Sequence, residues 1–477
     1  MTFKSIVGMI NGVVWSDALV LLCLAAGLFF SIKTRFVQVR LVGEMVRLMF
    51  EGRESRRGIS SFQALAVSLS GRVGTGNIAG VAAAIAMGGP GAVFWMWMIA
   101  FLGAATAYVE AALAQIYKVE KQGEYRGGPA FYIEKGLGKR WYALLFAGAT
   151  IVGEGLFLPG VQSHSIAAGL DHAFGVPHIV TGLGVVILLG FIIFGGIKRI
   201  GHVAQVVVPF MAVGYVLLAT VIIAINIDKV PGVIALIFSS AFGLNSIFGG
   251  AIGSAIAFGV KRGVYSNEAG QGSAPHAAAA AEVTHPAKQG LVQAFSVYID
   301  TLLVCSATAF MILVTGKYNV VSKAGGFLVE NIPGVEMGPV YTQMAIDTTL
   351  GAGSALVAVA LFFFAFTTLM AYYYIAETNV VYLEKSSRQK WMVAILRFAL
   401  LAATFFGTVH TTTVAWELGD IGVGIMAWLN IVAIFILAKP ALACLKDYET
   451  QRARGIDPVF DPKKLGIKNA DFWETIR

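Results

Sequence analysis

Long apolar runs alternate with short polar segments along the whole chain. A helix that crosses a membrane needs about 20 mostly apolar residues, and the pattern predicts eleven such spans. A shorter apolar run, 229-242, contains Pro231 and is expected to form a helix outside the membrane. The chain is therefore predicted to be an all-α polytopic membrane protein. The predicted spans are 13-31, 62-87, 90-117, 141-168, 177-195, 202-226, 246-279, 288-316, 352-383, 391-409 and 414-438.

The composition also favours a membrane protein. Of the 477 residues, 57% are hydrophobic and 13% are charged, whereas soluble proteins carry about 25% charged residues. The net charge of +8 comes from Lys and Arg in the loops, so topology explains it and nucleic acid is not expected as a partner. Three scattered cysteines, Cys23, Cys305 and Cys444, do not suit a disulfide framework or a metal site. The protein is expected to lie in a lipid bilayer. No bound cofactor is expected.

Basic residues indicate which loops lie inside the cell. The loop from Lys33 to Arg57 is rich in them, and cytoplasmic loops carry an excess of Lys and Arg. Eleven crossings then place the N-terminus outside and the C-terminus in the cytoplasm of a multi-pass plasma (inner) membrane protein. Within that loop, Val37 to Phe50 is expected to form one amphipathic helix on the membrane face. The basic residues of the loops predicted inside are Lys33, Arg35, Arg40, Arg47, Arg53, Arg56, Arg57, Lys121, Arg126, Lys135, Lys139, Arg140, Lys198, Arg199, Lys288, Lys385, Arg388 and Lys390.

Two of the predicted spans are interrupted by glycines and polar residues. The first contains Ser70-Gly71-Arg72-Val73-Gly74-Thr75-Gly76-Asn77-Ile78-Ala79-Gly80, and the second contains Arg262-Gly263-Val264-Tyr265-Ser266-Asn267-Glu268-Ala269-Gly270-Gln271-Gly272-Ser273-Ala274-Pro275. Glycine weakens a helix by up to about 1 kcal/mol relative to alanine, and unwound backbone at membrane depth occurs only where it is buried or lines a cavity. Glycines alone fit close helix packing equally well. Thr75 and Asn77 favour a binding site instead.

The interruptions open two consecutive sets of five spans, 62-226 and 246-438. Because five is odd, the sets have opposite orientations, which predicts a five-plus-five inverted repeat with one extra N-terminal helix. Half-helix N-termini in such a repeat favour a carboxylate, and freed carbonyls favour a cation such as sodium. The expected activity is cotransport of an anionic or zwitterionic solute, not an enzymatic reaction. The other segments are the N-terminal span and basic loop, 1-61, an extracytoplasmic connector, 227-245, and a cytoplasmic tail, 439-477.

Three motifs closely resemble those of the alanine or glycine:cation symporter family. They are Gly74-Thr75-Gly76-Asn77-Ile78-Ala79-Gly80-Val81, then Gly88-Gly89-Pro90-Gly91-Ala92-Val93-Phe94-Trp95-Met96-Trp97, then Ser266-Asn267-Glu268-Ala269-Gly270-Gln271-Gly272-Ser273-Ala274-Pro275 with His285-Pro286, Gln289-Gly290-Leu291 and Asp300-Thr301 after it. The resemblance implies the leucine-transporter type of fold. It also implies sodium-coupled uptake of alanine, glycine or similar small neutral amino acids.

The resemblance further implies which residues bind the solute and the ion. Carried over by position, the sodium ligands are the carbonyls of Ser70 and Val73 with the hydroxyls of Thr367 and Thr368. A threonine in a membrane helix also commonly bonds its own backbone, which is the alternative for both hydroxyls. The residues implied to surround the amino acid are Gly74, Thr75, Gly76, Asn77, Ser266, Asn267, Gly270, Gly272 and Ser273, to which the cavity-facing Gln162 is added.

Two departures from the family pattern bear on the site. Gln162 stands where the resemblance leads us to expect an asparagine, which leaves its local role open. Arg72 brings a positive charge into the first interruption and favours one sodium ion over two. Asp300 is expected to form a structural ion pair with Arg72. A charge at the membrane centre costs at least about 2.5 kcal/mol, so each acid within or near a span is a functional candidate. These acids are Glu110, Glu154, Glu268, Asp300 and Glu377.

Three other functions compete with sodium symport. Proton coupling in place of sodium is the nearest, and the acids within or near the predicted spans are compatible with it. An ion channel is the second, because glycine-rich polar breaks also form selectivity filters, although two unlike breaks in one chain suit a pocket better than a pore. A membrane-embedded enzyme would need a nucleophile, paired acids or a metal constellation on facing helices, and the sequence offers none of these.

Overall fold

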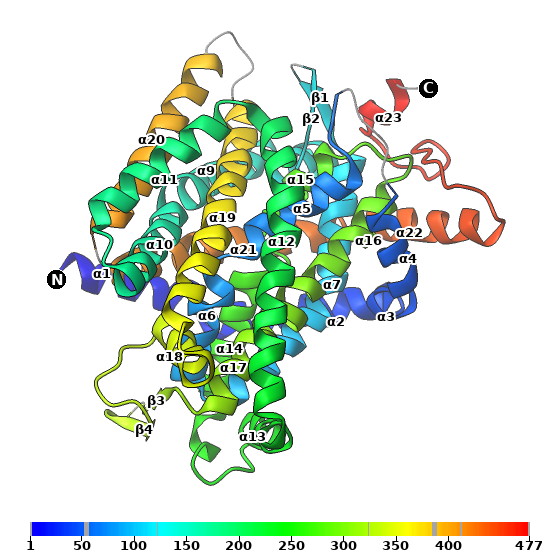
Figure 1. The fold of residues 1–477 in the computed structure, drawn as a ribbon. Helices are drawn as coiled ribbons and strands as arrows, with labels where there is room; N and C mark the ends of the chain where they lie inside the picture. Colours follow the sequence, from blue (N-terminus) through cyan, green and yellow to red (C-terminus); the bar gives the residue numbers. More distant parts are fainter. Residues whose placement is uncertain are drawn as a thin grey trace.

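The computed structural model describes residues 2–51, 57–121, 123–322, 324–383, 389–410 and 413–475, and its regular structure is almost entirely helical (Figure 1). This outcome confirms the predicted all-helical class. Four of the basic residues used to orient the chain, Arg53, Arg56, Lys385 and Arg388, lie outside the described residues.

Eight helical stretches of the described residues are long and apolar enough to cross a membrane. Three of them are built from two helices each, and α11, His178–Ile193, is apolar but shorter. The eight are α1, Phe3–Val14, with α2, Asp17–Lys33; α7, Gly91–Ile116; α9, Arg140–Val152, with α10, Leu158–Phe174; α12, Gly196–Ile225; α16, Pro286–Val297, with α17, Ser306–Thr315; α19, Gly353–Leu383; α20, Gln389–Val409; and α21, Thr413–Ile436.

Both glycine-rich stretches interrupt their helices. In the first, α5, Ser61–Arg72, ends before a short 3₁₀ turn, Thr75–Asn77, and α6, Ala79–Gly88, continues beyond it. In the second, α14, Ile252–Asn267, and α15, Ala274–Ala280, are separated by six residues. Within those six, Glu268, Gly270 and Gly272 have φ angles of 56°, 86° and 92°. This left-handed backbone suits glycine and cannot continue a helix, so the sequence itself causes the second break.

Two further helices contain a π-helical turn that the apolar pattern does not predict. The segment Gly153–Phe157 joins α9 to α10, and the segment Tyr298–Cys305 joins α16 to α17. A π turn inserts an extra residue into the helix and rotates the side chains that follow it, and such turns are frequent at functional sites. Each of these two carries a buried acid, Glu154 and Asp300.

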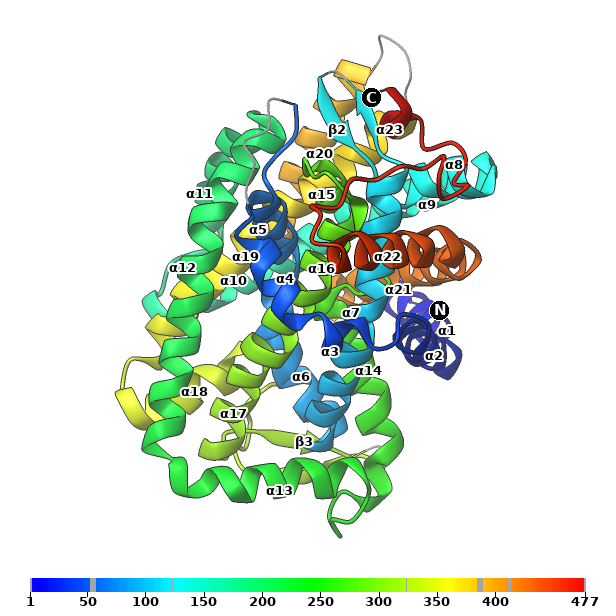
Figure 2. The ribbon, with the colours of Figure 1, turned by 90° about the vertical axis from the view of Figure 1, so that its right-hand side faces the viewer.

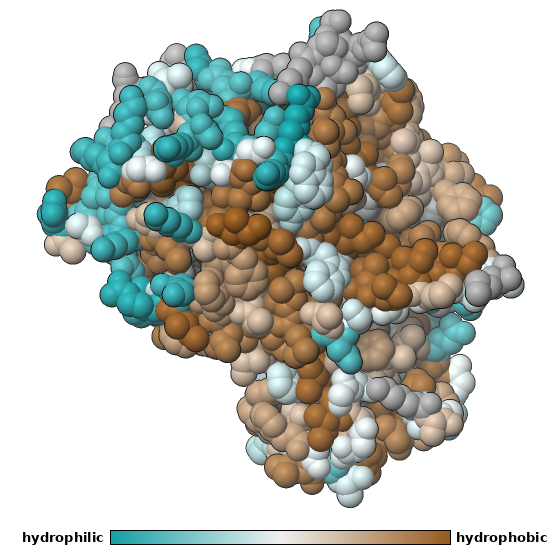
Figure 3. All heavy atoms as spheres, turned by 180° about the vertical axis from the view of Figure 1, so that it is seen from behind, coloured by the Kyte–Doolittle hydropathy of each residue, from teal (hydrophilic) through white to brown (hydrophobic). Residues whose placement is uncertain are grey.

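The outer helices present large apolar side chains to the surroundings. Ile187 and Phe191 on α11 and Phe210 on α12 are 70%, 72% and 71% exposed. Figure 3 shows hydrophobic residues covering most of one face, with hydrophilic residues gathered at one edge. Water would make such a surface unfavourable, at about 25 cal/mol per Å² of apolar area, whereas hydrocarbon would not. The protein is a multi-pass membrane protein, with a surface suited to lipid.

Smaller elements cover the ends and sides of the helical body. At one end, α13, Val230–Ala241, lies crosswise beneath the other helices (Figure 2). The predicted helix over 37-50 is present as two pieces, because Leu41 leaves the helical conformation (φ −111°, ψ 18°). The remaining elements are α3, Val37–Arg40; α4, Val42–Met49; β1, Val119–Lys121, paired antiparallel with β2, Glu124–Arg126; α8, Pro129–Leu137; β3, Asn319–Val321, paired antiparallel with β4, Phe327–Glu330; α18, Pro339–Leu350; α22, Ala438–Ala453; and α23, Asp471–Thr475.

Candidate functional site

The first interruption is held open by side chains in place of helical hydrogen bonds. The Gly74 N–H donates to Asn77 Oδ1 (2.8 Å), and the Thr75 N–H donates to Gln162 Oε1 (3.0 Å). Thr308 Oγ1 donates to the Asn77 carbonyl (2.7 Å). The main-chain N–H and C=O groups freed by the break are therefore hydrogen-bonded to side-chain amide and hydroxyl groups. A side chain can rotate and release such a main-chain group to a solute.

Asp300 joins the two interruptions. Its Oδ1 accepts from Asn77 Nδ2 (2.6 Å), and its Oδ2 accepts from Ser266 Oγ (2.9 Å) and Thr301 Oγ1 (2.6 Å). The carboxylate is completely buried. Hydrogen bonds to an ionised group are about twice as strong as neutral ones, so Asp300 fixes Asn77 and Ser266 relative to each other.

The predicted ion pair between Arg72 and Asp300 is wrong. Arg72 Nη1 donates instead to the Gln293 carbonyl (3.2 Å) and to the Ser296 hydroxyl. Among the ion pairs formed by the described residues, none joins Arg72 to Asp300 within 4.0 Å. The π-helical turn at Asp300 explains the difference, because it directs this side chain toward the interruptions.

Gln162 belongs to the same cluster. It lies on α10, and its Nε2 donates to the Tyr372 hydroxyl of α19 (3.3 Å) while its Oε1 accepts from Thr75. The side chain is 1% exposed. Gln162 thus links the first interruption to α19.

Two glycines of the first interruption, Gly74 and Gly76, are closely approached by other side chains. A Cβ on Gly74 would lie 2.5 Å from Thr368 Oγ1, and a Cβ on Gly76 would lie 3.2 Å from the Tyr265 ring. Real Cβ contacts essentially never fall below 3.0 Å. The backbone at Gly74 is therefore closely approached by α19, as a small binding site requires.

The predicted sodium ligands separate into two groups. Thr368 Oγ1 donates to the Ser70 carbonyl (2.7 Å) and to the Phe364 carbonyl of its own helix (2.9 Å). Thr367 Oγ1 donates to the Phe363 and Phe364 carbonyls of its own helix (2.9 and 3.0 Å) and approaches Met211 of α12 (3.7 Å to sulfur). Ser70 and Thr368 are thus in contact, whereas the Thr367 hydroxyl contacts its own helix and α12.

The residues of the second interruption do not all approach the first. Gly71 and Gly76 lie close to the second, since their Cβ positions are 3.4 Å from Glu268 Oε2 and 3.5 Å from the Ser266 Cα. Gly270 and Gly272 face the other way: the Gly270 carbonyl accepts from Asn430 (3.0 Å), and a Cβ on Gly272 would lie 2.8 Å from Pro129. Asn267 Oδ1 accepts from the Ala269 N–H (3.0 Å). Three polar atoms of the predicted site are buried without a hydrogen-bond partner in the described part of the chain: Thr75 Oγ1, Asn267 Nδ2 and Ser273 Oγ.

Sequence reasoning did not assign several residues that contact this cluster. Tyr372 and Tyr265 were available from the sequence, since one lies in an aromatic run and the other in the second polar stretch. Asn430 was not, because its partners Glu110 (2.8 Å) and Gly270 are 320 and 160 residues away in the chain. The one signal for Asn430 in the sequence is that a polar residue stands within an apolar span.

Contacts on both sides of the second interruption enclose the site. On the α14 side, Arg262 donates to both oxygens of Asp420 on α21 (2.9 and 3.1 Å). On the α15 side, the Ile59 N–H donates to the Ala280 carbonyl, and the Glu282 N–H donates to the Ile59 carbonyl (both 3.0 Å). The segment before the first interrupted helix is thereby tied to the end of the second.

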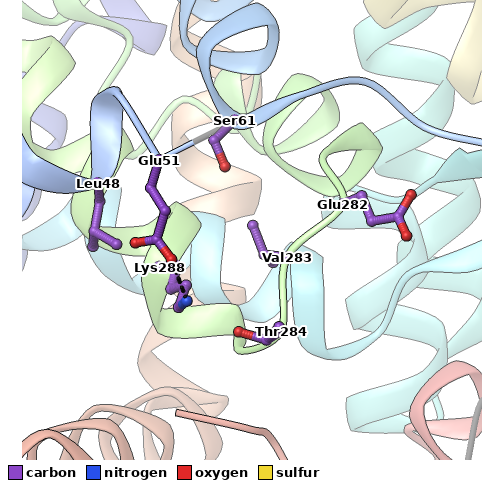
Figure 4. A pocket seen from close by; sticks show the side chains of 7 residues that line it. All are labelled: Leu48, Glu51, Ser61, Glu282, Val283, Thr284 and Lys288. Atoms are coloured by element: carbon purple, nitrogen blue, oxygen red, sulfur yellow. Dashed lines mark hydrogen bonds and ion pairs between the residues drawn. The ribbon is translucent and has the colours of Figure 1, made fainter. Parts of the chain in front are cut away.

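A surface hollow lies next to the backbone hydrogen bonds that join Ile59 to Ala280 and Glu282. Figure 4 shows its lining, with Lys288 paired to Glu51 (2.8 Å); the hollow has about 290 Å³ of empty volume. None of its lining residues belongs to the predicted site, so it is separate from the central cluster. The lining residues are Leu48, Glu51, Ser61, Glu282, Val283, Thr284 and Lys288.

Known proteins resemble this chain over its whole length. The profile of the sodium:alanine symporter family matches residues 1–462. The putative sodium/proton-dependent alanine carrier protein YrbD of Bacillus subtilis (strain 168) is 64% identical over 469 residues, covering 98% of this chain and 97% of that protein. The sodium/proton-dependent alanine carrier protein of Bacillus sp. (strain PS3) is 56% identical over 433 residues, or 90% of this chain and 97% of that protein.

A solved structure shares the fold. The substrate-bound, outward-open state of a Na⁺-coupled sialic acid symporter aligns with a TM-score of 0.51 over 98% of this chain and 97% of that chain, at 13% identity. At this identity the likeness concerns the fold alone. The family match confirms the resemblance found in the motifs, and it identifies the chain as a transporter and not an enzyme. This chain belongs to the sodium:alanine symporter family.

Proposed function

We propose that this protein imports small neutral amino acids, alanine and glycine, together with sodium by alternating access. The observation that carries the proposal is the contact between the two interruptions through Asp300, Asn77 and Ser266. The Gly74 and Thr75 N–H groups are held by two amide oxygens. A solute carboxylate would take the place of those oxygens, since it accepts the same hydrogen bonds with more charge.

Sodium is proposed to bind beside this position. The Ser70 carbonyl and the Thr368 hydroxyl already touch, and with the Val73 carbonyl they offer the hard oxygen atoms that a small cation prefers. Thr367 completes the proposed set only if its hydroxyl rotates away from Phe363 and Met211. We therefore assign Thr368 the larger role.

The proposed topology has eleven spans, arranged as a five-plus-five inverted repeat, 62-226 and 246-438, after one N-terminal helix. The eight long apolar stretches of the described residues support this count if α11 and the two interrupted helices also cross the membrane. In this arrangement the N-terminus lies outside and the C-terminal tail lies in the cytoplasm of the plasma membrane. The basic loops support this orientation.

Uptake into vesicles tests the proposed function. The purified protein is reconstituted in liposomes, and radiolabelled alanine is added outside with an inward sodium gradient. We expect saturable uptake that choline in place of sodium abolishes at constant pH, and that unlabelled glycine competes away. Uptake that does not saturate would favour a channel, and uptake that choline leaves intact would exclude sodium coupling.

Proton coupling is the second candidate. The printed names of both Bacillus relatives join sodium and proton, and the interior holds several buried acids. Imposing a proton gradient without sodium separates the two: uptake under that condition alone would favour the proton as the driving ion.

A further inference from the structure

We propose that Glu154 is a second cation site of this transporter and that it holds a proton beside the second interruption. The inference rests on the proposed function, because a coupling proton has meaning only in a symporter. It concerns a residue outside the predicted solute and sodium sites.

Glu154 is placed by the π-helical turn between α9 and α10 and is completely buried. Its neighbours in the turn are glycines that let other helices approach. A Cβ on Gly153 would lie 3.4 Å from Gly422 of α21, and a Cβ on Gly155 would lie 3.2 Å from Leu396 of α20. The extra residue of the turn directs the carboxyl group toward Gln271 in the second interruption.

The hydrogen bonds of Glu154 leave a place for one proton. Its Oε1 accepts from Gln271 Nε2 (3.1 Å), whereas its Oε2 is buried without a hydrogen-bond partner in the described part of the chain. The polar groups around it, the Gln271 amide and the Ser273 hydroxyl, are both neutral. A carboxyl group that has only neutral partners is less costly to bury with its proton than without it.

The charges around Glu154 favour its neutral form. Glu268 lies at the start of the second interruption, with its carboxylate oxygens 3.4 and 3.5 Å from the Cβ position of Gly71. It adds a charge of the same sign beside Glu154. An ionised carboxylate in a low-dielectric interior is very costly without an opposite charge, and a second carboxylate beside it adds to the cost.

Among the described residues, no Lys, Arg or His on the elements packed around the π turn forms an ion pair with Glu154. Tyr265 of α14 and Tyr372 of α19 lie near it and are neutral. On α20, Arg397 is already shared between Tyr373 and Glu377 (2.7 and 3.7 Å). On α21, Asp420 is paired with Lys261 and Arg262.

Proton transfer at this position is balanced without another reactant. When the second interruption opens to the outer side, a hydronium ion in the entering water gives its proton to Oε2, and a neutral carboxyl group forms. When the interruption opens to the other side, the O–H bond breaks and the proton leaves to water. During the return, the Gln271 amide and the Ser273 hydroxyl donate to the ionised Glu154 and offset part of the cost of its charge, and one proton has crossed.

The test measures proton entry and alanine entry in the same liposomes. Wild type and Glu154→Gln are reconstituted with a pH-sensitive dye inside, and alanine is added outside with sodium on both sides. We expect alanine to acidify the interior with wild type, and we expect Glu154→Gln to lose at least nine-tenths of that signal. Glu377→Gln is the matched control, because Glu377 is a buried acid paired with Arg126 and Arg397, and its proton entry per alanine should equal that of wild type.

The possible results separate the proton site at Glu154 from the proposed sodium symport. Sodium-driven uptake by wild type without any acidification overturns the proton site and leaves the proposed function intact; no sodium-driven uptake overturns the proposed function. A Glu154→Gln protein that needs more sodium while its proton entry is unchanged would make this a sodium site instead. A further requirement does not depend on the folding of Glu154→Gln: an inside-alkaline gradient must accelerate wild-type sodium-driven uptake at least twofold, and its failure to do so overturns the proton site.

Discussion

At the first interruption, single atoms decide how closely the helices approach. A Cβ on Gly74 would lie 2.5 Å from Thr368 Oγ1, which is too short, and 3.2 Å from Gln162 Oε1, which is tight. A nearby glycine of α6, Gly80, has its closest such neighbour at 3.9 Å, the side chain of Arg262. Gly74 and Gly80 therefore serve as a test position and its control for substitution by alanine.

We predict that Gly74→Ala lowers alanine uptake by at least tenfold, because the new methyl group displaces Thr368 and Gln162 from the proposed site. The measurement is initial uptake in liposomes, normalised to the amount of inserted protein. Gly80→Ala should keep uptake within twofold of wild type. Equal uptake by both variants would mean that the solute does not bind at Gly74.

The two adjacent threonines of α19 offer a second comparison. We predict that Thr368→Ala raises the sodium concentration for half-maximal uptake by at least fivefold, because its hydroxyl touches the Ser70 carbonyl. Thr367→Ala should raise it by less than twofold, since that hydroxyl bonds its own helix and Met211. Uptake is measured against sodium at constant ionic strength. The reverse order of effects would contradict our assignment of the larger role to Thr368.

Asn77 contacts both the broken backbone and Asp300. We predict that Asn77→Ala lowers uptake by about 10- to 100-fold, because hydrogen bonds to charged groups contribute about 1.5–3 kcal/mol. Membrane insertion should remain normal, as judged by the amount of monodisperse protein after purification. Wild-type uptake by this variant would show that the predicted site is misplaced.

At the scale of elements, α4 is joined to α22 by ionisable groups outside the spans. Glu44 accepts from Arg47 (2.8 Å) and from the Tyr448 hydroxyl, and it pairs with Arg452 (3.1 Å). The hydrogen bond from Arg47 is the main cause that lowers the pKa of Glu44 from 4.5 to about 2. The carboxylate therefore stabilises the contact in its ionised form.

We predict that the α4–α22 contact is fully present above pH 4.5 and weakens as the pH falls through about 2. The sign follows from the lowered pKa of Glu44: Tyr448 and Arg452 of α22 bind its ionised form, so protonation removes their share of the stabilisation, while Arg47 stays beside Glu44 on α4. Protease accessibility of the loop before α5 reports the contact. Glu44→Gln should show at pH 7 the accessibility that wild type shows only in strong acid, and an unchanged Glu44→Gln protein would contradict the assignment.

At the scale of the whole molecule, the C-terminal segment ties distant helices together. The Phe460 N–H donates to the Thr284 carbonyl (3.0 Å), and Asp457 pairs with Lys288 (2.6 Å). Farther along, Trp473 Nε1 donates to the Gln115 carbonyl (2.9 Å), and its ring packs on Phe460 (5.2 Å between centroids). The segment thus contacts α7 and the loop between α15 and α16.

We predict that Phe460→Ala destabilises the protein by about 3–5 kcal/mol, because a side chain that is 1% exposed leaves a cavity. Ile456→Ala should change the stability by less than about 0.5 kcal/mol, since Ile456 is 52% exposed. Thermal unfolding in detergent compares the two. A similar melting temperature for both variants would show that the C-terminal segment does not pack as described.

The two interruptions could be located from the sequence because their cause is local. Gly270 and Gly272 adopt φ angles that other residues rarely adopt, and polar groups such as Thr75 and Asn77 are out of place in a plain lipid-facing helix. The same holds for the apolar runs, whose length alone matches the membrane. Motif resemblance then named the family, which the full-length match confirms.

The partners of those residues depend on tertiary structure. Asp300 reaches Asn77 across 223 residues of sequence, and Glu154 reaches Gln271 across 117. Both acids owe their direction to a π-helical turn, which no apolar pattern reveals because the turn shifts the helix by a single residue. The sequence therefore determined where helices run and where they break. Packing alone decided that Arg72 bonds Ser296 and not Asp300, since hydrogen bonds depend on distances that close only when the helices assemble.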